Sequence, residues 1–303
     1  MPPIATHSEI WSRFYPERYR IDDALFEQNV FGCRLTIRDA SVLDREDGFI
    51  VVKASAPGRV FPGHESNTAH ISAIAFDDDA LGDELWDHAF RTLRKEGIES
   101  VSFGGDWRHF FPGCPVDCER LASFLERKGM VASETLQYDL ERNLASYEPP
   151  VTPTVEARPC VASDYERLDE FLAREFPGRW HTDVMGKFTE NPSRVTGLFL
   201  RGLCEGFAMT QLEGDTNRYA GAVWSADLGS HWGALGPIGV SKGVRGQGYG
   251  DGVLAAALCY LRDQGAQQTI IDWTTLVDFY GRHGFEVTRM YRTYTMKLEP
   301  QDS

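Results

Sequence analysis

Two kinds of hydrophobic pattern alternate along the chain. Apolar residues recur every three to four positions over residues 164–176 and 250–265, which predicts two amphipathic helices. Shorter apolar or alternating runs, VTGLFL, GFAMTQL, ALGPIGV and TIIDW, predict strands between and after them, and FEVTRMYRTYTMKL predicts a closing strand. Strands and helices therefore alternate, and the expected fold class is α/β with a mixed sheet.

The first half of the chain repeats this order. The predicted helix from Gly82 to Gly97 has the same length as the one from Gly250 to Gly265, and each precedes an apolar strand, IESVSF or QQTIIDW. Further on, FLERKGM parallels FYGRHGF, although the first half carries the extra segment GGDWRHFFPGCPVD between these elements. The shared order indicates an internal duplication and two domains.

The clearest break in the pattern is RNLASYEPPVTPTVE, from Arg142 to Glu156. Pro149, Pro150 and Pro153 oppose helix and favour an extended linker. We therefore expect domains at 1–148 and 149–303.

Charge and cysteine usage narrow the class of protein. The formal net charge is −14, which argues against nucleic acid or an anionic membrane as the main partner and is compatible with a cationic substrate. No apolar run is long enough to span a bilayer, and the N-terminus has no apolar signal-peptide core, so we expect a cytoplasmic protein. The six cysteines are scattered, and Cys114 and Cys118 lack a second pair that would complete a zinc site, so we expect no metal.

A glycine-rich segment follows the predicted strand that ends at Val240. Three glycines among the residues from Gly246 to Gly250 allow backbone N–H groups to converge, and the N-terminus of the next helix adds partial positive charge. Such a cradle suits a diphosphate. The spacing fits neither the dinucleotide fingerprint nor the P-loop. Taken alone, the segment could equally be a tight structural turn.

Two motifs in order carry a family resemblance. The pattern Arg-x-x-Gly-x-Gly, from Arg245 to Gly250, resembles the acetyl-CoA-binding motif of the GCN5-related N-acetyltransferase (GNAT) superfamily. The segment DFYGRHGFE, from Asp278 to Glu286, resembles the second signature of that superfamily, a helix with a Tyr before a Gly-Phe turn. The resemblance covers residues 155–298 well and the first half more weakly. It implies two tandem acyl-CoA N-acyltransferase domains, with acetyl-CoA as co-substrate.

The resemblance also implies roles for particular residues. The backbone of residues 238–240 would pair with the pantetheine arm, and the Val240 N–H would polarise the acetyl carbonyl. Tyr280 would protonate the departing thiolate, although the residue alone reads as a core aromatic. Thr274 or Thr275 stands where the family often has Asn. The residues expected to hold acetyl-CoA are Ile238, Gly239, Val240, Arg245, Gly246, Gln247, Gly248, Tyr249, Gly250, Thr274, Thr275 and Phe279.

The first half departs further from the motifs. Its strand AHISAIAF leads into three aspartates, Asp77 to Asp79, which would repel a diphosphate, and Leu125 stands where the second half has Tyr280. We expect that the first domain binds no acetyl-CoA and serves as a support that closes the substrate cleft.

An amine acceptor must lose a proton before it attacks. Asp272, inside an apolar strand, is the expected general base, although a structural hydrogen bond would also explain it; Glu205 and Asp106 are weaker candidates. We expect the acceptor between the domains, reached by two aromatic loops, GGDWRHFFPG and FPGRWH. The alternative is that both are packed turns, with His109 and His181 in packing or surface roles. The expected acceptor-binding residues are Asp106, Trp107, His109, Arg179 and Trp180.

A narrower resemblance concerns the acceptor. The segments HFFPG, FPGRW and DWTTLVDFY are similar to those of bacterial tandem enzymes that acetylate glucosamine-type amino sugars. The expected function is acetyl transfer from acetyl-CoA to a primary amine, such as that of an amino sugar. Two alternatives stay open: a non-catalytic acyl-CoA sensor or interaction module, and an N-acyltransferase for another small amine or a peptide. The sequence leaves the oligomeric state open.

Overall fold

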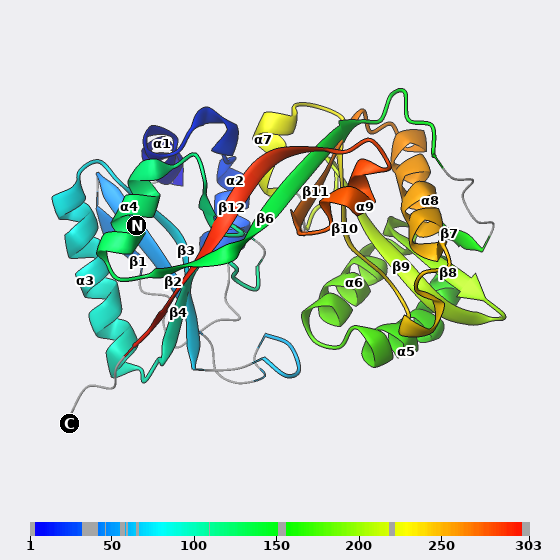
Figure 1. Cartoon of the computed structure of the whole chain (residues 1–303), viewed down its shortest axis with the longest axis horizontal. Helices are drawn as coiled ribbons and strands as arrows, with labels where there is room; N and C mark the ends of the chain where they lie inside the picture. The colour runs from blue at the N-terminus through cyan, green and yellow to red at the C-terminus, as the bar shows by residue number, and fades with distance from the viewer. Residues whose placement is uncertain are drawn as a thin grey trace. The chain divides into compact units, whose positions relative to one another are not determined.

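A computed structural model of the chain describes residues 4–31, 42–45, 47–54, 58, 60–64, 67–108, 110–150, 156–217 and 222–298. The chain divides into two compact units (Figure 1). The first unit comprises residues up to 137 together with those from 289 onward, and the second unit comprises residues 138–288. Each is a mixed α/β unit.

The first unit is built around a sheet in the order β1-β2-β3-β4-β12, with β5 also pairing to β12. Its strands β3 and β4 are parallel and are connected by the helix α3, while the other pairs are antiparallel. Its described elements are α1 (Ile4–Phe14), η1 (Glu17–Tyr19), α2 (Asp23–Leu25), η2 (Phe26–Phe31), β1 (Val42–Arg45), β2 (Gly48–Ala54), β3 (Thr68–Phe76), α3 (Asp79–Lys95), β4 (Ser100–Phe103), β5 (Cys114–Pro115) and α4 (Glu119–Arg127).

The second unit repeats this plan, with the order β6-β11-β10-β9-β8-β7 and a parallel pair, β10 and β11, connected by α8. Its elements are β7 (Ala157–Pro159), η3 (Ala162–Asp164), α5 (Tyr165–Glu175), α6 (Arg179–Glu190), η4 (Pro192–Arg194), β8 (Val195–Leu200), β9 (Leu203–Leu212), η5 (Ala222–Trp224), α7 (Ser225–Leu228), β10 (Trp232–Val240), η6 (Lys242–Val244), α8 (Tyr249–Asp263), β11 (Gln268–Thr274) and α9 (Val277–Gly281). The expected mixed-sheet α/β fold with a duplicated unit is confirmed.

Each face of the second sheet carries its own core. Leu198 and Ala208 pack with the apolar stripe of α8, whereas Phe207 and Met209 pack with α5 and α6. Because side chains alternate along a strand, these neighbours in β8 and β9 point to opposite faces. The sheet is therefore covered by α8 on one face and by α5 and α6 on the other.

Two strands contribute to both units, and this differs from the expected division at 148/149. The strand β6 (Val131–Asn143) enters the second unit at Tyr138, and β12 (Glu286–Lys297) returns to the first unit at Arg289. Leu144 and Tyr147, assigned to the first domain from sequence, are buried in the core beneath α8. The residues just before the prolines are therefore part of the second unit.

The segment FPGRWH, expected to be a loop, instead leads into α6, which begins at Arg179. Val184, Met185 and Phe188 recur at helical spacing and are buried, which accounts for the helix.

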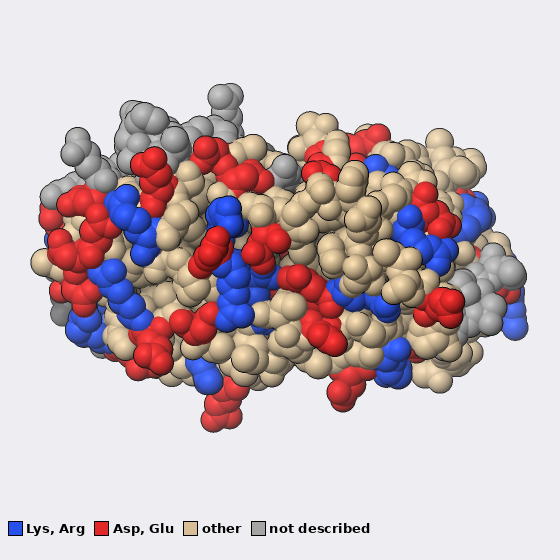
Figure 2. All heavy atoms as spheres, turned by 90° about the horizontal axis from the view of Figure 1, so that it is seen from above, with Lys and Arg blue, Asp and Glu red and all other residues tan. Residues whose placement is uncertain are grey.

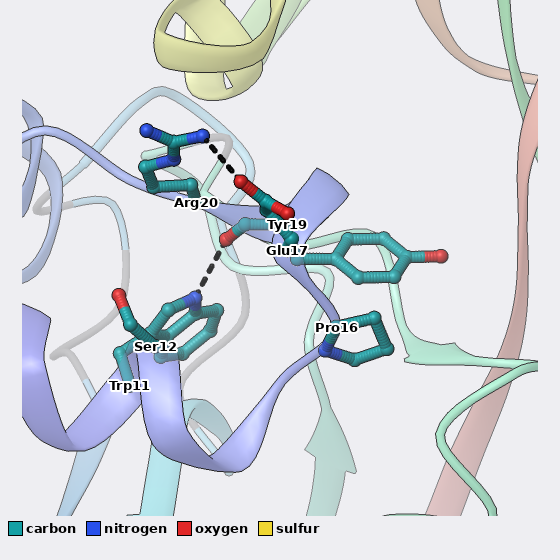
Figure 3. A pocket seen from close by; sticks show the side chains of 6 residues that line it. All are labelled: Trp11, Ser12, Pro16, Glu17, Tyr19 and Arg20. Atoms are coloured by element: carbon teal, nitrogen blue, oxygen red, sulfur yellow. Dashed lines mark hydrogen bonds and ion pairs between the residues drawn. The ribbon is translucent and has the colours of Figure 1, made fainter.

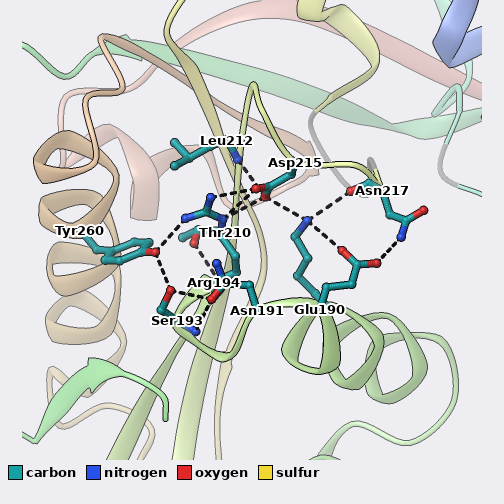
Figure 4. A network of polar contacts seen from close by, with 10 residues as sticks. Glu190, Asn191, Ser193, Arg194, Thr210, Leu212, Asp215, Asn217 and Tyr260 are labelled. Carbon is teal, nitrogen blue, oxygen red and sulfur yellow. Dashed lines mark hydrogen bonds and ion pairs between the residues drawn. The ribbon is translucent and has the colours of Figure 1, made fainter. Parts of the chain in front are cut away.

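A polar network fixes the far end of α6 (Figure 4). Asp215, after β9, accepts from Arg194 at 2.8 Å and lies 2.9 Å from the ammonium of the buried Lys187 near the end of α6. Burial opposes the charge of Asp215, but the hydrogen bonds from Arg194 and Lys187 hold its pKa below the usual value. The network therefore ties the C-terminal end of α6 to the sheet.

On the face that Figure 2 shows, basic side chains are interspersed with acidic ones. Among the helices that the structure describes, none is both long and apolar enough to cross a bilayer.

Candidate functional site

Strands β10 and β11 pair only at their beginnings. Their parallel register runs from Trp232 opposite Gln268 to Ala234 opposite Ile270. Beyond that point β10 continues along β9, with a register shift between Leu235 and Ile238. The segment Ile238 to Val240, expected to receive the pantetheine arm, lies in the part of β10 that has separated from β11 and is half-buried.

The glycine loop lies between the end of β10 and the start of α8. Gly246 and Gly248 have φ values of +76° and +84°, a left-handed conformation that favours glycine. A Cβ on either would meet no atom within 4 Å, so the space beside the loop is open. The residues from Arg245 to Gly248 are exposed. Gly248 is the N-cap residue of α8 and has no side chain to accept from the helix's first N–H groups. The first turn of α8 therefore presents backbone N–H donors toward open space.

Tyr280 on α9 is buried, with 4% of its surface exposed. Burial raises the pKa of its phenol well above the usual value, the negative charge of Asp272 raises it further, and a hydrogen bond with the Thr274 side chain opposes the rise. The Thr274 hydroxyl also accepts from the Leu276 N–H at 3.0 Å. The structure therefore brings Tyr280, Asp272 and Thr274 together, with the phenol protonated at neutral pH.

The other residues expected beside the cofactor differ in their surroundings. The Phe279 ring lies 4.9 Å from that of Tyr280, centroid to centroid, and about 3.7 Å from where a Cβ on Gly250 would stand. Tyr249 is half-buried against the α8 core. Thr275 is exposed, and the Gln247 amide donates to the Gly243 carbonyl at 3.2 Å.

Aromatic side chains cover the same strand from the α5 and α6 side. The Phe176 ring packs so closely on Gly239 that a Cβ there would lie 2.4 Å from it, so this contact requires glycine. Trp180 stacks on Phe176 with centroids 5.4 Å apart and remains 36% exposed. The ring of Trp180 is therefore a large aromatic surface that stays open beside the end of β10.

Arg179 points from α6 toward β11. Its guanidinium lies 5.5 Å from the centroid of the Trp273 ring and 3.6 Å from the Asp183 carboxylate. Trp273 directly follows Asp272, so the charged end of α6 reaches the strand that carries the expected base. Glu205, a weaker candidate, lies 3.8 Å from Arg174, and its carbonyl accepts from Ser241.

Of the acceptor residues expected in the first unit, Asp106 and Trp107 are buried. Asp106 is fully buried in an ion pair with Lys53 at 2.8 Å and also accepts from the Arg108 N–H. Burial opposes the charge, but the Lys53 ammonium keeps the pKa of Asp106 below the usual value. Trp107 is 6% exposed, and His109 lies outside the described residues. Asp106 is thus a buried carboxylate engaged by Lys53, a placement that does not support the expected contact with acceptor hydroxyls.

The phenylalanines of HFFPG are also core residues. Phe110 and Phe111 are fully buried and contact Trp11, and Phe111 also contacts Tyr291. His181, in contrast, forms a half-exposed pair with Asp169 at 2.6 Å. These placements match the alternative of packed turns and a surface histidine.

A surface pocket of about 300 Å³ in the first unit offers no comparable chemistry (Figure 3). The Trp11 indole N–H donates to the Tyr19 carbonyl at 2.7 Å, and Arg20 pairs with Glu17 at 2.9 Å. The Trp11 indole, Arg20 and Glu17 are thus engaged by partners within the pocket lining. Within the described ranges no cluster of three or more His, Cys, Asp or Glu side chains could hold a metal ion, and burial raises the pKa of both Cys114 and Cys118.

Sequence reasoning missed three residues beside the site: Phe176, Asp183 and Trp273. Phe176 and Trp273 stand within motifs that the sequence had singled out, so their proximity to Trp180 and Asp272 was a usable signal. Asp183 lies four residues after Arg179, the spacing of a helical ion pair, but that signal needs α6 to be recognised first.

Residues 165–285 match the model of the acetyltransferase (GNAT) family. These residues form a GNAT-family domain. Members of the family use acetyl-CoA as co-substrate and transfer its acetyl group to amines. No curated protein sequence matches the chain.

Solved structures share the fold over both units. A glucosamine N-acetyltransferase region of a fungal multi-domain GH3 β-N-acetylglucosaminidase has a TM-score of 0.82 at 19% identity, over 97% of this chain and 37% of that one. This chain therefore spans little more than a third of that protein. A tandem GNAT protein from the clavulanic acid biosynthesis pathway has a TM-score of 0.64 at 13% identity, over 99% and 96% of the chains. A GNAT from Sphaerobacter thermophilus has a TM-score of 0.60 at 15% identity, over 85% and 83%. The tandem GNAT fold is thereby established.

Proposed function

We propose that the second unit is an acetyl-CoA-dependent N-acetyltransferase that acts on the primary amine of a small molecule. The observation that carries the proposal is the convergence of three features where β10 leaves β11. An open glycine loop at the start of α8 suits the diphosphate, the separated strand suits the pantetheine arm, and a protonated phenol lies near a carboxylate.

Each group has a role in the transfer. Asp272 accepts a proton from the ammonium of the acceptor, directly or through a water, because only the neutral amine has a lone pair for attack. The Val240 N–H polarises the acetyl carbonyl as the C–N bond forms. The C–S bond then breaks as Tyr280 donates its proton to the departing thiolate, and the second proton lost by the attacking nitrogen restores the phenol. Its raised pKa keeps that proton in place until a strong base develops beside it.

A glucosamine-type amino sugar is the proposed acceptor class. The exposed ring of Trp180 offers an apolar platform for a sugar face, and Arg179 with Asp183 offers hydrogen-bonding groups at the same helix end. The likeness to the glucosamine N-acetyltransferase region supports this choice at the level of fold.

We further propose that the first unit binds no acetyl-CoA. Only Asp77 and Asp78 separate β3 from α3, where the second unit has the glycine loop. Asp78 caps α3 by accepting from the Leu81 N–H at 3.0 Å, and Asp77 pairs with Arg13 at 2.9 Å. The Tyr15 hydroxyl donates to the Ile74 carbonyl of β3 at 2.9 Å. The helix N-terminus and the strand that would receive the ligand are thus engaged by the unit's own side chains.

The test is thiol release from acetyl-CoA by the full chain against amines of several classes: glucosamine and muramic-type sugars, polyamines, aminoglycosides and short peptides. The proposal predicts turnover with amino sugars and one acetyl-CoA bound per chain by calorimetry. Binding without thiol release for any amine would instead favour the sensor, and turnover only with another amine class would refute the sugar assignment.

A further inference from the structure

Strand β11 contains an irregularity next to the proposed base. In its antiparallel pairing with β6, Ile271 stands opposite Leu140 and Thr274 opposite Tyr138. Between these pairs β6 supplies one residue, Asp139, and β11 supplies two, Asp272 and Trp273. This is the arrangement of a β-bulge, which re-aims side chains and is common next to active sites.

The side chain of Asp139 lies at this bulge. It is fully buried, and its two oxygens accept from different donors. Oδ1 accepts from the backbone N–H of Trp273 at 3.1 Å, and Oδ2 accepts from the indole N–H of Trp224 at 2.8 Å. Trp224 is itself buried, in the segment before α7. The carboxylate therefore links the bulged backbone to a fixed partner on another element.

The bulge imposes a demanding backbone conformation. Trp273 has a φ of +49°, in the left-handed region that a Trp seldom adopts. Such conformations persist where the surroundings over-determine them. The backbone N–H of Trp273 itself donates to Asp139, so the carboxylate stabilises the residue that has the unfavourable backbone conformation.

Two groups of the proposed site depend on this geometry. A regular strand would send Asp272 and Trp273 to opposite faces, and a one-residue change in register would reverse them. With the bulge, both are half-buried, the charge of Asp272 acts on Tyr280, and the Trp273 ring faces the Arg179 guanidinium.

We infer that Asp139 is a positioning residue for the acetyl transfer, because its buried carboxylate holds the β11 bulge that places Asp272 near Tyr280 and Trp273 near Arg179. This inference rests on the proposed function. It assigns Asp139 an effect mainly on the amine side of the reaction and little on acetyl-CoA binding, because the glycine loop and the end of β10 do not contribute to the bulge.

The chemistry of the two donors suggests a specific test. A carboxylate can accept from both N–H groups, whereas Asn at this position offers one oxygen acceptor and one NH₂ donor. In Asp139→Asn the NH₂ group must face either the Trp273 backbone N–H or the Trp224 indole N–H. Because both of these are donors, one of the two hydrogen bonds is lost. Adding Trp224→Phe removes one donor, so that the Asn oxygen can turn toward the Trp273 N–H.

The experiment measures kcat, the KM for the amine and the Kd for acetyl-CoA in the full chain. Asp139→Asn is expected to lower kcat about 100-fold, the size of effect that follows from a 1 Å misplacement of reacting groups, with the acetyl-CoA Kd within about threefold of wild type. Asp139→Asn with Trp224→Phe is expected to recover about tenfold of that loss, because removing one donor relieves the unsatisfied hydrogen bond. Asp164→Asn, at a fully buried carboxylate held by Arg158 in the same unit, is the matched control and should lower stability with kcat unchanged.

Folded Asp139→Asn with a wild-type kcat would overturn the inference, as would a loss of kcat matched by an equal loss of acetyl-CoA affinity. If Asp139→Asn does not fold, Trp224→Phe alone decides: kcat lowered several-fold at unchanged acetyl-CoA Kd supports the inference, and unchanged kcat overturns it. A wild-type chain that turns over no amine would refute the proposed function and this inference with it. Turnover by wild type that Asp139→Asn retains refutes the inference alone.

Discussion

Replacing Tyr280 with Phe removes a single hydroxyl from the proposed site. The ring is 4% exposed and packs between Phe279 and Phe285, so Phe fills the same volume. The change costs the hydrogen bond with Thr274, whose hydroxyl still accepts from the Leu276 N–H. We therefore expect a folded protein that has lost about 1 kcal/mol of its free energy of unfolding.

The effect on catalysis should be larger. A positioned general acid contributes about 100-fold or more to the rate. Loss of the Tyr280 proton should therefore lower kcat about 100-fold, which corresponds to about 2.7 kcal/mol in the activation barrier. Because burial raises the pKa of Tyr280, the wild-type acid stays protonated through the alkaline range, and no loss of kcat from its deprotonation is expected below pH 10.

The assay is steady-state thiol release at saturating amine, with the acetyl-CoA Kd measured by calorimetry. Tyr260→Phe is the matched control, because the Tyr260 hydroxyl meets Arg194 at 2.8 Å and Ser193 at 3.0 Å in the network of Figure 4. It should cost similar stability and leave kcat unchanged. If Tyr280→Phe keeps the wild-type kcat from neutral to alkaline pH, the phenol is not the acid.

Three further predictions concern binding, stability and the acceptor. Gly248→Ala forces a Cβ into a left-handed conformation and should weaken acetyl-CoA binding, measured by calorimetry, while Gly214→Ala, where φ is not positive and space is open, should not. Asp215→Asn removes the nearer of the two carboxylates beside the buried Lys187, at 2.9 Å against 3.4 Å for Glu190, so denaturant unfolding should show a loss of about 3 kcal/mol with kcat per folded molecule unchanged. Trp180→Ala should raise the KM for an amino sugar about tenfold, the scale of one lost aromatic contact, and leave the acetyl-CoA Kd unchanged; an unchanged KM would contradict the platform.

The local elements of the second unit were largely predictable from sequence. The stripe of α8 and the strands β8 and β11 follow from periodicity, because their apolar positions face a core in the way that the pattern assumes. The helix α6 was missed because an aromatic Phe-Pro-Gly start reads as a turn, and its apolar face becomes evident only after Trp180.

The exchange of strands between the units was not predictable. The local pattern of β12 indicates a strand but not its partners, and its second half pairs with β4 and β5 of the first unit. Asp106 shows the same limit in a side chain. An acid after a strand resembles a ligand contact in the sequence, and only the fold reveals Lys53 opposite it.

The candidate site divides in a similar way. The glycine loop and Tyr280 could be predicted because each belongs to a contiguous motif. The bulge that links Asp139 to Trp273 joins residues far apart in the chain, so no local pattern indicates it. An acid such as Asp139 in an alternating strand indicates at most that some hydrogen-bond donor lies near it, and does not identify that donor.

The most direct test of the central claim follows the acetyl group itself. Wild-type chain is incubated with deuterium-labelled acetyl-CoA and glucosamine, and the mass of the sugar product is recorded with time. Acetyl transfer by the second unit predicts a product heavier by one labelled acetyl group, formed catalytically and lost in Tyr280→Phe. Labelled acetyl-CoA that binds but leaves glucosamine and every other amine unmodified would contradict the account.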